Sequence, residues 1–339
     1  MSHAINPVAV TFAPTWFARH YGMDFGEDFW TDPVERTEGF REQQRLLFER
    51  FADVKLGSAD PGAGPNISQR YGNYFMPALF GCEIVYPKDQ APANLPLENR
   101  SLEAMAGLKV PDFETNPVIQ TGLWEARVLA EKYGACAGGI NTGSPLNVAV
   151  NIFAEDFLMA CATDPEVAQH VLRVIAETEF KLYREVSALI QPEGFPLDRM
   201  VFGYGNCPAV MLSPRIYREV VLPVDLWVRE QVGDFYLHHC GVFDAYIDVY
   251  KPLNPTALDI GGGSDYRAIR QSYKETPFSL IVNAELVEQK RPREVDDYIG
   301  EMVESASPAE LISLLWTSEL SAEVPDETVK AIATAHEAL

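Results

Sequence analysis

The chain has 339 residues, of which 47% are apolar and 22% are charged, as in a globular protein with a large core. Its 49 acidic residues outnumber its 27 basic ones, and the formal net charge of −22 would repel phosphate backbones and anionic lipid head groups. Nucleic acid and membrane surfaces are therefore not expected as partners, although a local basic pocket could still bind an anion.

The cysteines and the N-terminus indicate the compartment. The five cysteines are an odd number and are widely spaced, so we expect reduced thiols. They are Cys82, Cys136, Cys161, Cys207 and Cys240. Residues 1–23 lack a basic region followed by a long apolar run, and no segment reaches about 18 uninterrupted apolar residues. We therefore expect a cytoplasmic protein.

The first part of the chain is predicted to be helical. Apolar residues at helical spacing between Pro33 and Val54 indicate an amphipathic helix, and we expect residues 1–60 to form a mainly helical region that packs on the rest. Residues 57–64 and 86–96 are typical of loops. Because no linker or low-complexity tract interrupts the chain, we predict one domain over residues 1–339.

Two helices of the second half have clear start signals. Asp164-Pro165 supplies an N-cap and a proline at the first helical position, and a long apolar-periodic segment follows. Ser213-Pro214 has the same arrangement, and Gly233 can end the helix that follows it.

Short apolar runs then alternate with helix-length segments. The runs cover residues 235–237, 257–260, 278–282 and 311–316, and helices are predicted from about Val242, Asp265, Pro292 and Pro325. Strands separated by helical crossovers form parallel βαβ units. This pattern fits either a closed barrel or an open doubly wound sheet.

In both architectures, the reactive groups belong at the carboxyl ends of the strands. The polar groups at those positions are Tyr204, Asn206 and Cys207; His238, His239 and Cys240; Asp259; Asn283 and Glu285; and Thr317, Ser318 and Glu319. Of these, Tyr204, Asn206 and Asn283 are our candidates for contacts to a substrate.

The segment His238-His239-Cys240-Gly241 is the most informative. Residues two apart on a strand project to the same side, so His238 and Cys240 could hold one soft cation such as zinc, with His239 facing the other way. Histidines beside a cysteine also occur as ordinary core residues, so spacing alone leaves both interpretations open.

An HxCG segment after a strand resembles the uroporphyrinogen decarboxylase superfamily. Here it is preceded by the Leu212-Ser213-Pro214 helix and followed by a strand that contains Asp259. Three earlier segments are also similar: 72–75, Thr142-Gly143-Ser144-Pro145 and 157–167. The resemblance is closer to the corrinoid- and zinc-dependent methyltransferases, such as methylcobamide:coenzyme M methyltransferase. It implies a TIM-type (β/α)8 barrel with an additional N-terminal helical region.

The resemblance also implies a ligand set. In the methyltransferase branch, zinc is held by the His and Cys of HxC, in some members by an acidic residue after the next strand, and by a second Cys near the C-terminus. These correspond to His238, Cys240 and Asp259, but Thr317-Ser318-Glu319 contains no cysteine. Glu319, or Glu285, could supply an oxygen in its place and Cys207 a second sulfur. The alternatives are that the glutamates are solvated and that Cys207 is a buried structural thiol, which is the more common state of a free cysteine.

The function implied by the resemblance is zinc-dependent transfer of a methyl group between a corrinoid, or a methylated small molecule, and a thiol or related acceptor. Zinc would be the cofactor, and a corrinoid protein would be the partner beside a small-molecule substrate. A metal-independent decarboxylase or lyase is the alternative, although the Arg-Gln-Ala-Gly-Arg-Tyr motif of true uroporphyrinogen decarboxylases has only a faint counterpart at residues 17–21. A non-catalytic member that binds a corrinoid or small ligand is a third hypothesis.

Overall fold

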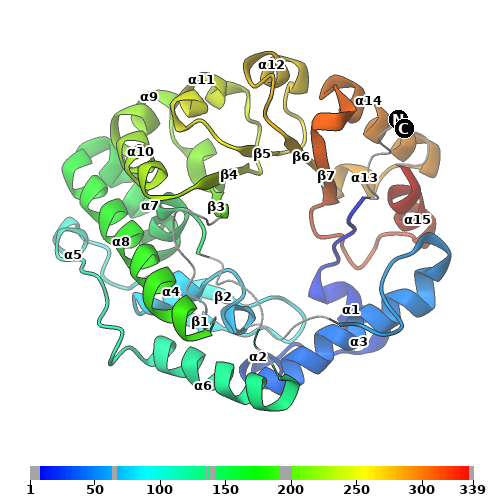
Figure 1. Cartoon of the computed structure of the whole chain (residues 1–339), viewed down its shortest axis with the longest axis horizontal. Helices are drawn as coiled ribbons and strands as arrows, with labels where there is room; N and C mark the ends of the chain where they lie inside the picture. The colour runs from blue at the N-terminus through cyan, green and yellow to red at the C-terminus, as the bar shows by residue number, and fades with distance from the viewer. Residues whose placement is uncertain (1–7, 63–66, 135, 137–141, 191–200, 336–339) are drawn as a thin grey trace.

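The computed structural model describes residues 8–62, 67–134, 136, 142–190 and 201–335. Its elements form a ring, in which a parallel sheet makes one side and helices make the other (Figure 1). The strands are β1 (Glu83–Val85), β2 (Ala93–Leu95), β3 (Val201–Gly205), β4 (Asp234–His239), β5 (Ala257–Ile260), β6 (Phe278–Val282) and β7 (Ile312–Thr317).

The main sheet contains five parallel strands in the order β3-β4-β5-β6-β7, so that sequence neighbours are also spatial neighbours. The N-terminal segment extends its β7 edge, because Ala9 and Phe12 form isolated parallel bridges with Trp316 and Leu320. A separate antiparallel pair is formed by β1 and β2. The strand positions that we predicted in the second half, including 257–260 and 278–282, are confirmed.

The prediction of a closed TIM-type (β/α)8 barrel is wrong. Within the described residues the parallel sheet has five strands, and its β3 and β7 edges are not joined into an eight-stranded cylinder. The physical reason lies in the first half of the chain, where apolar residues follow a helical period and build helices on the side of the ring opposite the sheet (Figure 1). The strand pattern itself had left an open sheet as an alternative.

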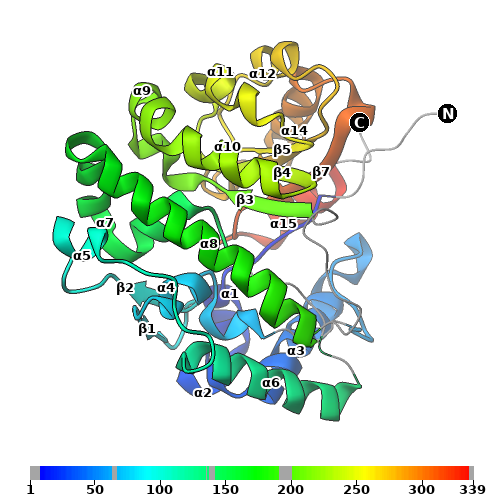
Figure 2. The ribbon, with the colours of Figure 1, turned by 60° about the vertical axis from the view of Figure 1, so that its left-hand side comes forward.

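The first half of the chain contributes eight helices to the described structure. They are α1 (Pro14–Tyr21), α2 (Glu27–Thr31), α3 (Pro33–Phe51), α4 (Phe75–Leu79), α5 (Leu102–Ala106), α6 (Pro117–Tyr133), α7 (Pro145–Thr163) and α8 (Pro165–Ile190). Several begin with a polar N-cap followed by proline: Asp32 accepts from the backbone of Val34 and Glu35 at the start of α3. The helix that we expected from Pro165 is α8, which contacts both α6 and α10 (Figure 2).

In the part of the chain that the structure describes, one helix, α7, is long and apolar enough to span a membrane. It carries Glu155 and Asp156 in its middle, and it packs against α8 and α4. Nine of its residues, among them Ile152, Phe153 and Phe157, are buried. We therefore assign α7 as a helix of the protein core.

The helices of the second half alternate with the strands. They are α9 (Pro214–Ile216), α10 (Leu222–Gln231), α11 (Ile247–Tyr250), α12 (Tyr266–Ser272), α13 (Ala284–Val287), α14 (Pro292–Ser305) and α15 (Asp326–Thr334). The Ser213-Pro214 start is confirmed, because the Ser213 hydroxyl accepts from the backbone N–H of Ile216.

A π-helical turn, Tyr217–Val221, joins α9 to α10. Pro223 has no N–H to donate to the carbonyl of Glu219, so the regular α-helical bond cannot form there. The freed carbonyl instead accepts from Gln169 Nε2 of α8 at 3.2 Å. This local widening turns Tyr217 inward, where its side chain is fully buried.

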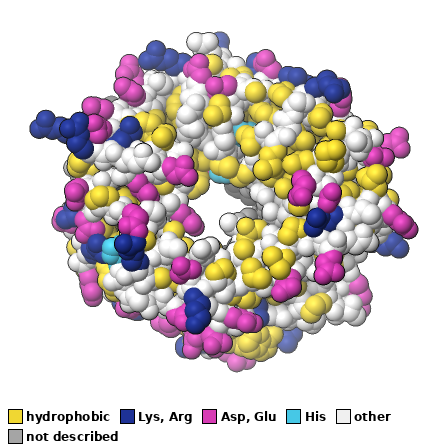
Figure 3. Space-filling model, turned by 180° about the vertical axis from the view of Figure 1, so that it is seen from behind, with side chains coloured by type: hydrophobic (Ala, Val, Ile, Leu, Met, Phe, Trp, Pro, Cys, Tyr) yellow, Lys and Arg dark blue, Asp and Glu magenta, His cyan; other side chains and the backbone are white. Residues whose placement is uncertain are grey.

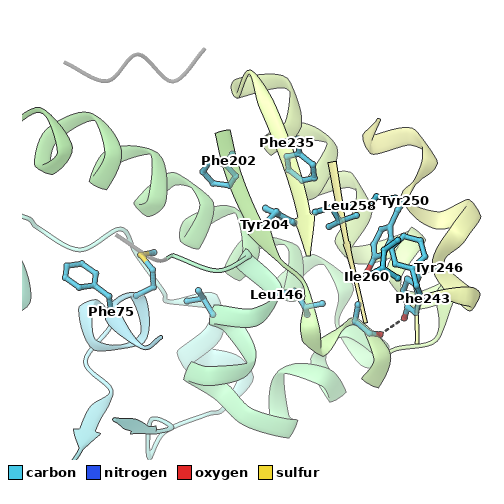
Figure 4. Close-up of a cluster of buried hydrophobic side chains, with 14 of the residues drawn as sticks. Phe75, Leu146, Phe202, Tyr204, Phe235, Phe243, Tyr246, Tyr250, Leu258 and Ile260 are labelled. Atoms are coloured by element: carbon cyan, nitrogen blue, oxygen red, sulfur yellow. Dashed lines mark hydrogen bonds between the residues drawn. The ribbon is translucent and has the colours of Figure 1, made fainter. Parts of the chain in front are cut away.

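Alternation along the strands gives the sheet two different faces. On the helix-covered face, Phe202, Phe235 and Leu258 of three neighbouring strands are fully buried, and Tyr246 and Tyr250 belong to the same cluster of buried side chains (Figure 4). The opposite face carries Tyr236 and His238, which are half-buried and face the centre of the ring. Burial of the apolar face therefore determines that Tyr236 and His238 are the side chains of β4 that face the cavity.

A buried polar network lies behind the same strands. Tyr204 and Tyr217 donate hydrogen bonds to the two oxygens of Asp225, a residue of α10. Asn206 Nδ2 donates to the hydroxyls of Tyr217 and Tyr250, the latter at 3.3 Å. Two tyrosine donors thus satisfy the carboxyl group of Asp225, although burial still raises its pKa to about 7.

Glu179 of α8 lies near Asp225 without such partners. Its side chain is fully buried, and among the described residues neither of its carboxyl oxygens has a hydrogen-bond partner. Burial, and then the charge of Asp225, raise its pKa well above the ordinary value. A protonated Glu179 is therefore the form that the fold accommodates.

This arrangement predicts a pH-dependent cost to stability. A carboxyl group whose pKa is raised by folding stabilises the native state most at pH values below its unfolded pKa, and this stability is lost as the pH rises through the folded pKa. Replacing Glu179 with glutamine should remove the effect. The stability of Glu179→Gln relative to the parent protein should rise with pH by up to about 1.4 kcal/mol per unit above about pH 5.

Urea unfolding at several pH values measures this difference. The matched control is Glu177→Gln, because Glu177 is exposed on the same helix two residues away. Parallel pH profiles for Glu179→Gln and the parent protein would contradict the assignment of a protonated Glu179.

Candidate functional site

The candidate site lies on the inner face of the sheet, at the carboxyl ends of β3, β4 and β5. The register aligns Gly205 with His238 and His238 with Asp259, so three neighbouring strands place one residue each in the same layer. Cys207 follows β3 by two residues and Cys240 follows β4 by one. Residues far apart in the sequence thus meet at one edge of the sheet.

The imidazole of His238 is oriented by a carboxylate. Its Nδ1 lies 2.7 Å from Asp259 Oδ2, and the other oxygen of Asp259 accepts from Trp316 Nε1 at 2.9 Å. The Asp259 side chain is only 5% exposed. Because a carboxylate accepts, Nδ1 carries a proton, and the remaining ring nitrogen, Nε2, is left for a partner on the other side of the ring.

Two thiols face this imidazole. The sulfur atoms of Cys207 and Cys240 and one ring nitrogen of His238 all lie within 4.8 Å of one another. Two sulfurs and one imidazole nitrogen form a donor set suited to zinc, and three protein ligands leave a position open, as in catalytic zinc sites. The chemistry of these donors and their partial exposure therefore fit a zinc ion.

The electrostatics of the three groups are strongly coupled. A hydrogen bond from Cys207, and then the proximity of His238, lower the pKa of Cys240, while the same thiol contact raises the pKa of Cys207. Burial opposes the charged form of His238, but hydrogen bonds to Asp259 and Cys240 outweigh it and raise its pKa to about 9. When no metal is bound, both shifts favour the charged forms, an imidazolium beside a thiolate.

Close backbone packing holds the loops after β3, β4 and β5 together. A Cβ atom on Gly261 would lie 2.1 Å from the carbonyl oxygen of Cys240, and one on Gly241 would lie 2.5 Å from Val210 Cγ1. The N–H of Gly261 also donates to the carbonyl of His239 at 2.8 Å. At Gly261 the close contacts are with backbone atoms, which cannot move aside, so only glycine fits and the Gly261-Gly262-Gly263 segment has a packing role at its first residue.

His239 faces away from the site and is fully buried. Its Nε2 lies 3.3 Å from the carbonyl of Val242, which can only accept, so Nε2 carries the proton and Nδ1 accepts from the Tyr250 hydroxyl at 3.0 Å. Burial lowers its pKa to about 4, which keeps the ring neutral. His239 therefore joins the buried network that also contains Asn206.

The other residues singled out from the sequence lie in different places. Tyr204 borders the cavity described below, but its hydroxyl points to Asp225. Asn206 is fully buried and accepts from the Ser144 hydroxyl at 3.3 Å. Asn283 caps α13, and Glu319 is exposed after β7. The described metal-competent cluster does not include Asp259 or Glu319.

A cavity of about 510 Å³ adjoins the cluster and lies at the centre of the ring, where the space-filling view is hollowed (Figure 3). His238, Asp259, Cys207 and Trp316 line one side of it. Residues that the sequence reasoning missed line the other side, among them Asn147 and Asn151. The signal for these two was their spacing of four residues on an otherwise apolar helix, which places both on one face.

Comparisons with known proteins show the fold alone. No protein-family model matches the chain, and no curated protein matches it in sequence. Among solved structures, a methyltransferase from Methanosarcina mazei is similar, with a TM-score of 0.66 and 17% sequence identity. The alignment covers 100% of this chain and 95% of that one, so the chain shares its fold with this protein over its whole length.

Proposed function

We propose that the protein is a metal-dependent methyltransferase with its reaction centre at Cys207, His238 and Cys240. The cluster of these side chains against the cavity, with Asp259 behind His238, carries the proposal. The fold shared with the Methanosarcina mazei methyltransferase supports it. The substrates would be a methylated small molecule or a methyl corrinoid, and a thiol or related acceptor.

The roles of the residues follow from their geometry. Cys207, Cys240 and His238 Nε2 would hold zinc, and Asp259 would orient the His238 ring as the carboxylate does in many zinc sites. Bound zinc would supply Lewis acidity that lowers the pKa of a thiol or polarises a substrate oxygen. A corrinoid protein is the partner that we propose to bring its methyl group to the cavity.

Metal binding is the first test. The purified protein should bind about one equivalent of zinc, and Cys207→Ala, Cys240→Ala and His238→Ala should each weaken binding at least about 100-fold, because each removes one of three ligands. Cobalt(II) should give a thiolate-to-metal charge-transfer band. Cys161→Ala is the control, since Cys161 is buried near the end of α7. A protein that remains metal-free after reconstitution would exclude the proposed centre.

The role of Asp259 can be separated from that of a direct ligand. Asp259→Asn should weaken zinc binding by about 10- to 100-fold, the usual cost of losing a carboxylate that orients a metal-binding histidine. Trp316→Phe removes only a neutral donor to Asp259 and should have a smaller effect. Competition with a chromogenic chelator gives the affinities. A loss as large as that of His238→Ala would make Asp259 a ligand, and no loss would remove its orienting role.

Activity is tested with methylcobalamin and a panel of small thiols. The zinc-loaded protein should demethylate methylcobalamin in the presence of an accepting thiol, which is followed by the change in corrinoid absorbance. Cys240→Ala should reduce the rate at least about 100-fold because it removes a metal ligand, while Cys161→Ala should not. Zinc-loaded protein that transfers no methyl group in either direction would contradict the proposed function.

A further inference from the structure

Two glycines of β3 create an open floor beside the metal-competent cluster. Gly203 and Gly205 lie on the same face of β3, and both line the cavity together with Cys207. A Cβ atom on Gly203 would meet no described heavy atom within 4 Å. One on Gly205 would lie 3.9 Å from both Asn147 Nδ2 and His238 Cδ2. The strand therefore leaves space where other residues would place a side chain.

Two asparagine side chains of α7, Asn147 and Asn151, line the cavity beside these glycines. Asn147 and Asn151 are one turn apart on α7, and Asn151 Nδ2 donates to Asn147 Oδ1 at 3.3 Å. Asn94 Nδ2 donates to the backbone carbonyl of Asn151 at 2.7 Å, which fixes this part of the helix. Asn147 Nδ2 is also directed to the carbonyl of Gly205 at 3.5 Å. These side chains thus offer fixed amide groups to a molecule lying on the glycines.

The charges on the opposite wall are already paired. Among the described residues that line the cavity, the acidic one is Asp259 and the basic one is His238, and they are hydrogen-bonded to each other. The second oxygen of Asp259 is taken by Trp316. Apart from the proposed metal position, the described side chains of this surface therefore offer no uncommitted charge to an anion or a cation, whereas uncharged hydrogen-bonding groups would find the asparagine amides.

We propose that the bay formed by Gly203, Gly205, Asn147 and Asn151 binds an uncharged small molecule that carries amide, hydroxyl or ether groups. This inference rests on the proposed function and assigns the bay to the small-molecule substrate of methyl transfer. The cavity volume of about 510 Å³ lies within the range of about 300–1,000 Å³ that is usual for small-molecule sites. Asn147 and Asn151 are then the residues that select the substrate, and the two glycines provide the room.

The proposal is tested with benzamide, benzoate and benzylammonium, which share one ring and differ in charge. Saturation-transfer NMR and titration of the zinc-free protein, in which no metal can bind a carboxylate, should show that benzamide binds at least about ten times more tightly than either ion. Gly203→Leu should abolish this binding by filling the bay, and Asn151→Leu should weaken it about ten-fold by removing one amide. Tighter binding of benzoate or benzylammonium, or no binding of benzamide, would overturn the proposal.

The controls separate loss of the bay from loss of the fold or of the metal. Gly62→Leu is the matched variant, because a Cβ atom there also meets nothing within 4 Å and Gly62 is exposed away from the cavity lining. It should bind benzamide as the parent does, and Gly203→Leu should keep its zinc stoichiometry. Cys240→Ala should lose zinc but still bind benzamide, so failure of the metal centre does not remove this readout. Unchanged benzamide binding by Gly203→Leu would place the ligand elsewhere.

Discussion

The two-residue period of β3 and β4 is the constraint on which the site depends. Successive side chains point to opposite faces, so His238 faces the cavity while its neighbour His239 is buried, and Gly205 faces the cavity while Asn206 is buried. A register shift by one residue would exchange these two sets completely. The packing that fixes the register therefore also fixes which imidazole can serve as a ligand.

The buried set secures that register with polar bonds as well as apolar contacts. His239 and Asn206 reach the same hydroxyl, that of Tyr250, and the network continues through Tyr217 to Asp225. Such a network is costly unless each member is paired, and here two tyrosine donors satisfy the carboxyl group of Asp225. Glu179 lies in the same region, but among the described residues its carboxyl group has no hydrogen-bonding partner. Ionising this buried group would therefore lower the stability of the folded state.

The strands and helices of the second half were predictable because their signals are local. Ser213-Pro214 starts a helix through a side-chain cap and a fixed proline, and the apolar run 278–282 forms a strand that is buried at every position. Closure of a sheet is not a local property. It depends on how the first half packs, and the resemblance to barrel proteins led us to a cylinder that the described residues do not form.

The site was predictable to a similar extent. The spacing of His238 and Cys240 follows from strand geometry, but the arrival of Cys207 beside them depends on the β3–β4 register and on the turn that follows β3. Trp316 could not be assigned to Asp259 from the sequence, because they are 57 residues apart and lie on strands that are not adjacent in the sheet. A side-chain contact between two strands that are not neighbours depends on the order of the strands in the sheet, which local sequence patterns do not determine.

The His238 ring connects the cluster to the proposed substrate bay. One ring nitrogen is held by Asp259, and its Cδ2 edge lies over the position where Gly205 lacks a side chain. Asn147 approaches the same position from α7. With the proposed function, a molecule in the bay would lie between the Asn147 amide and the edge of the His238 imidazole, beside the two thiols. Holding reactants in one geometry in this way is a large part of the catalytic effect in group transfer.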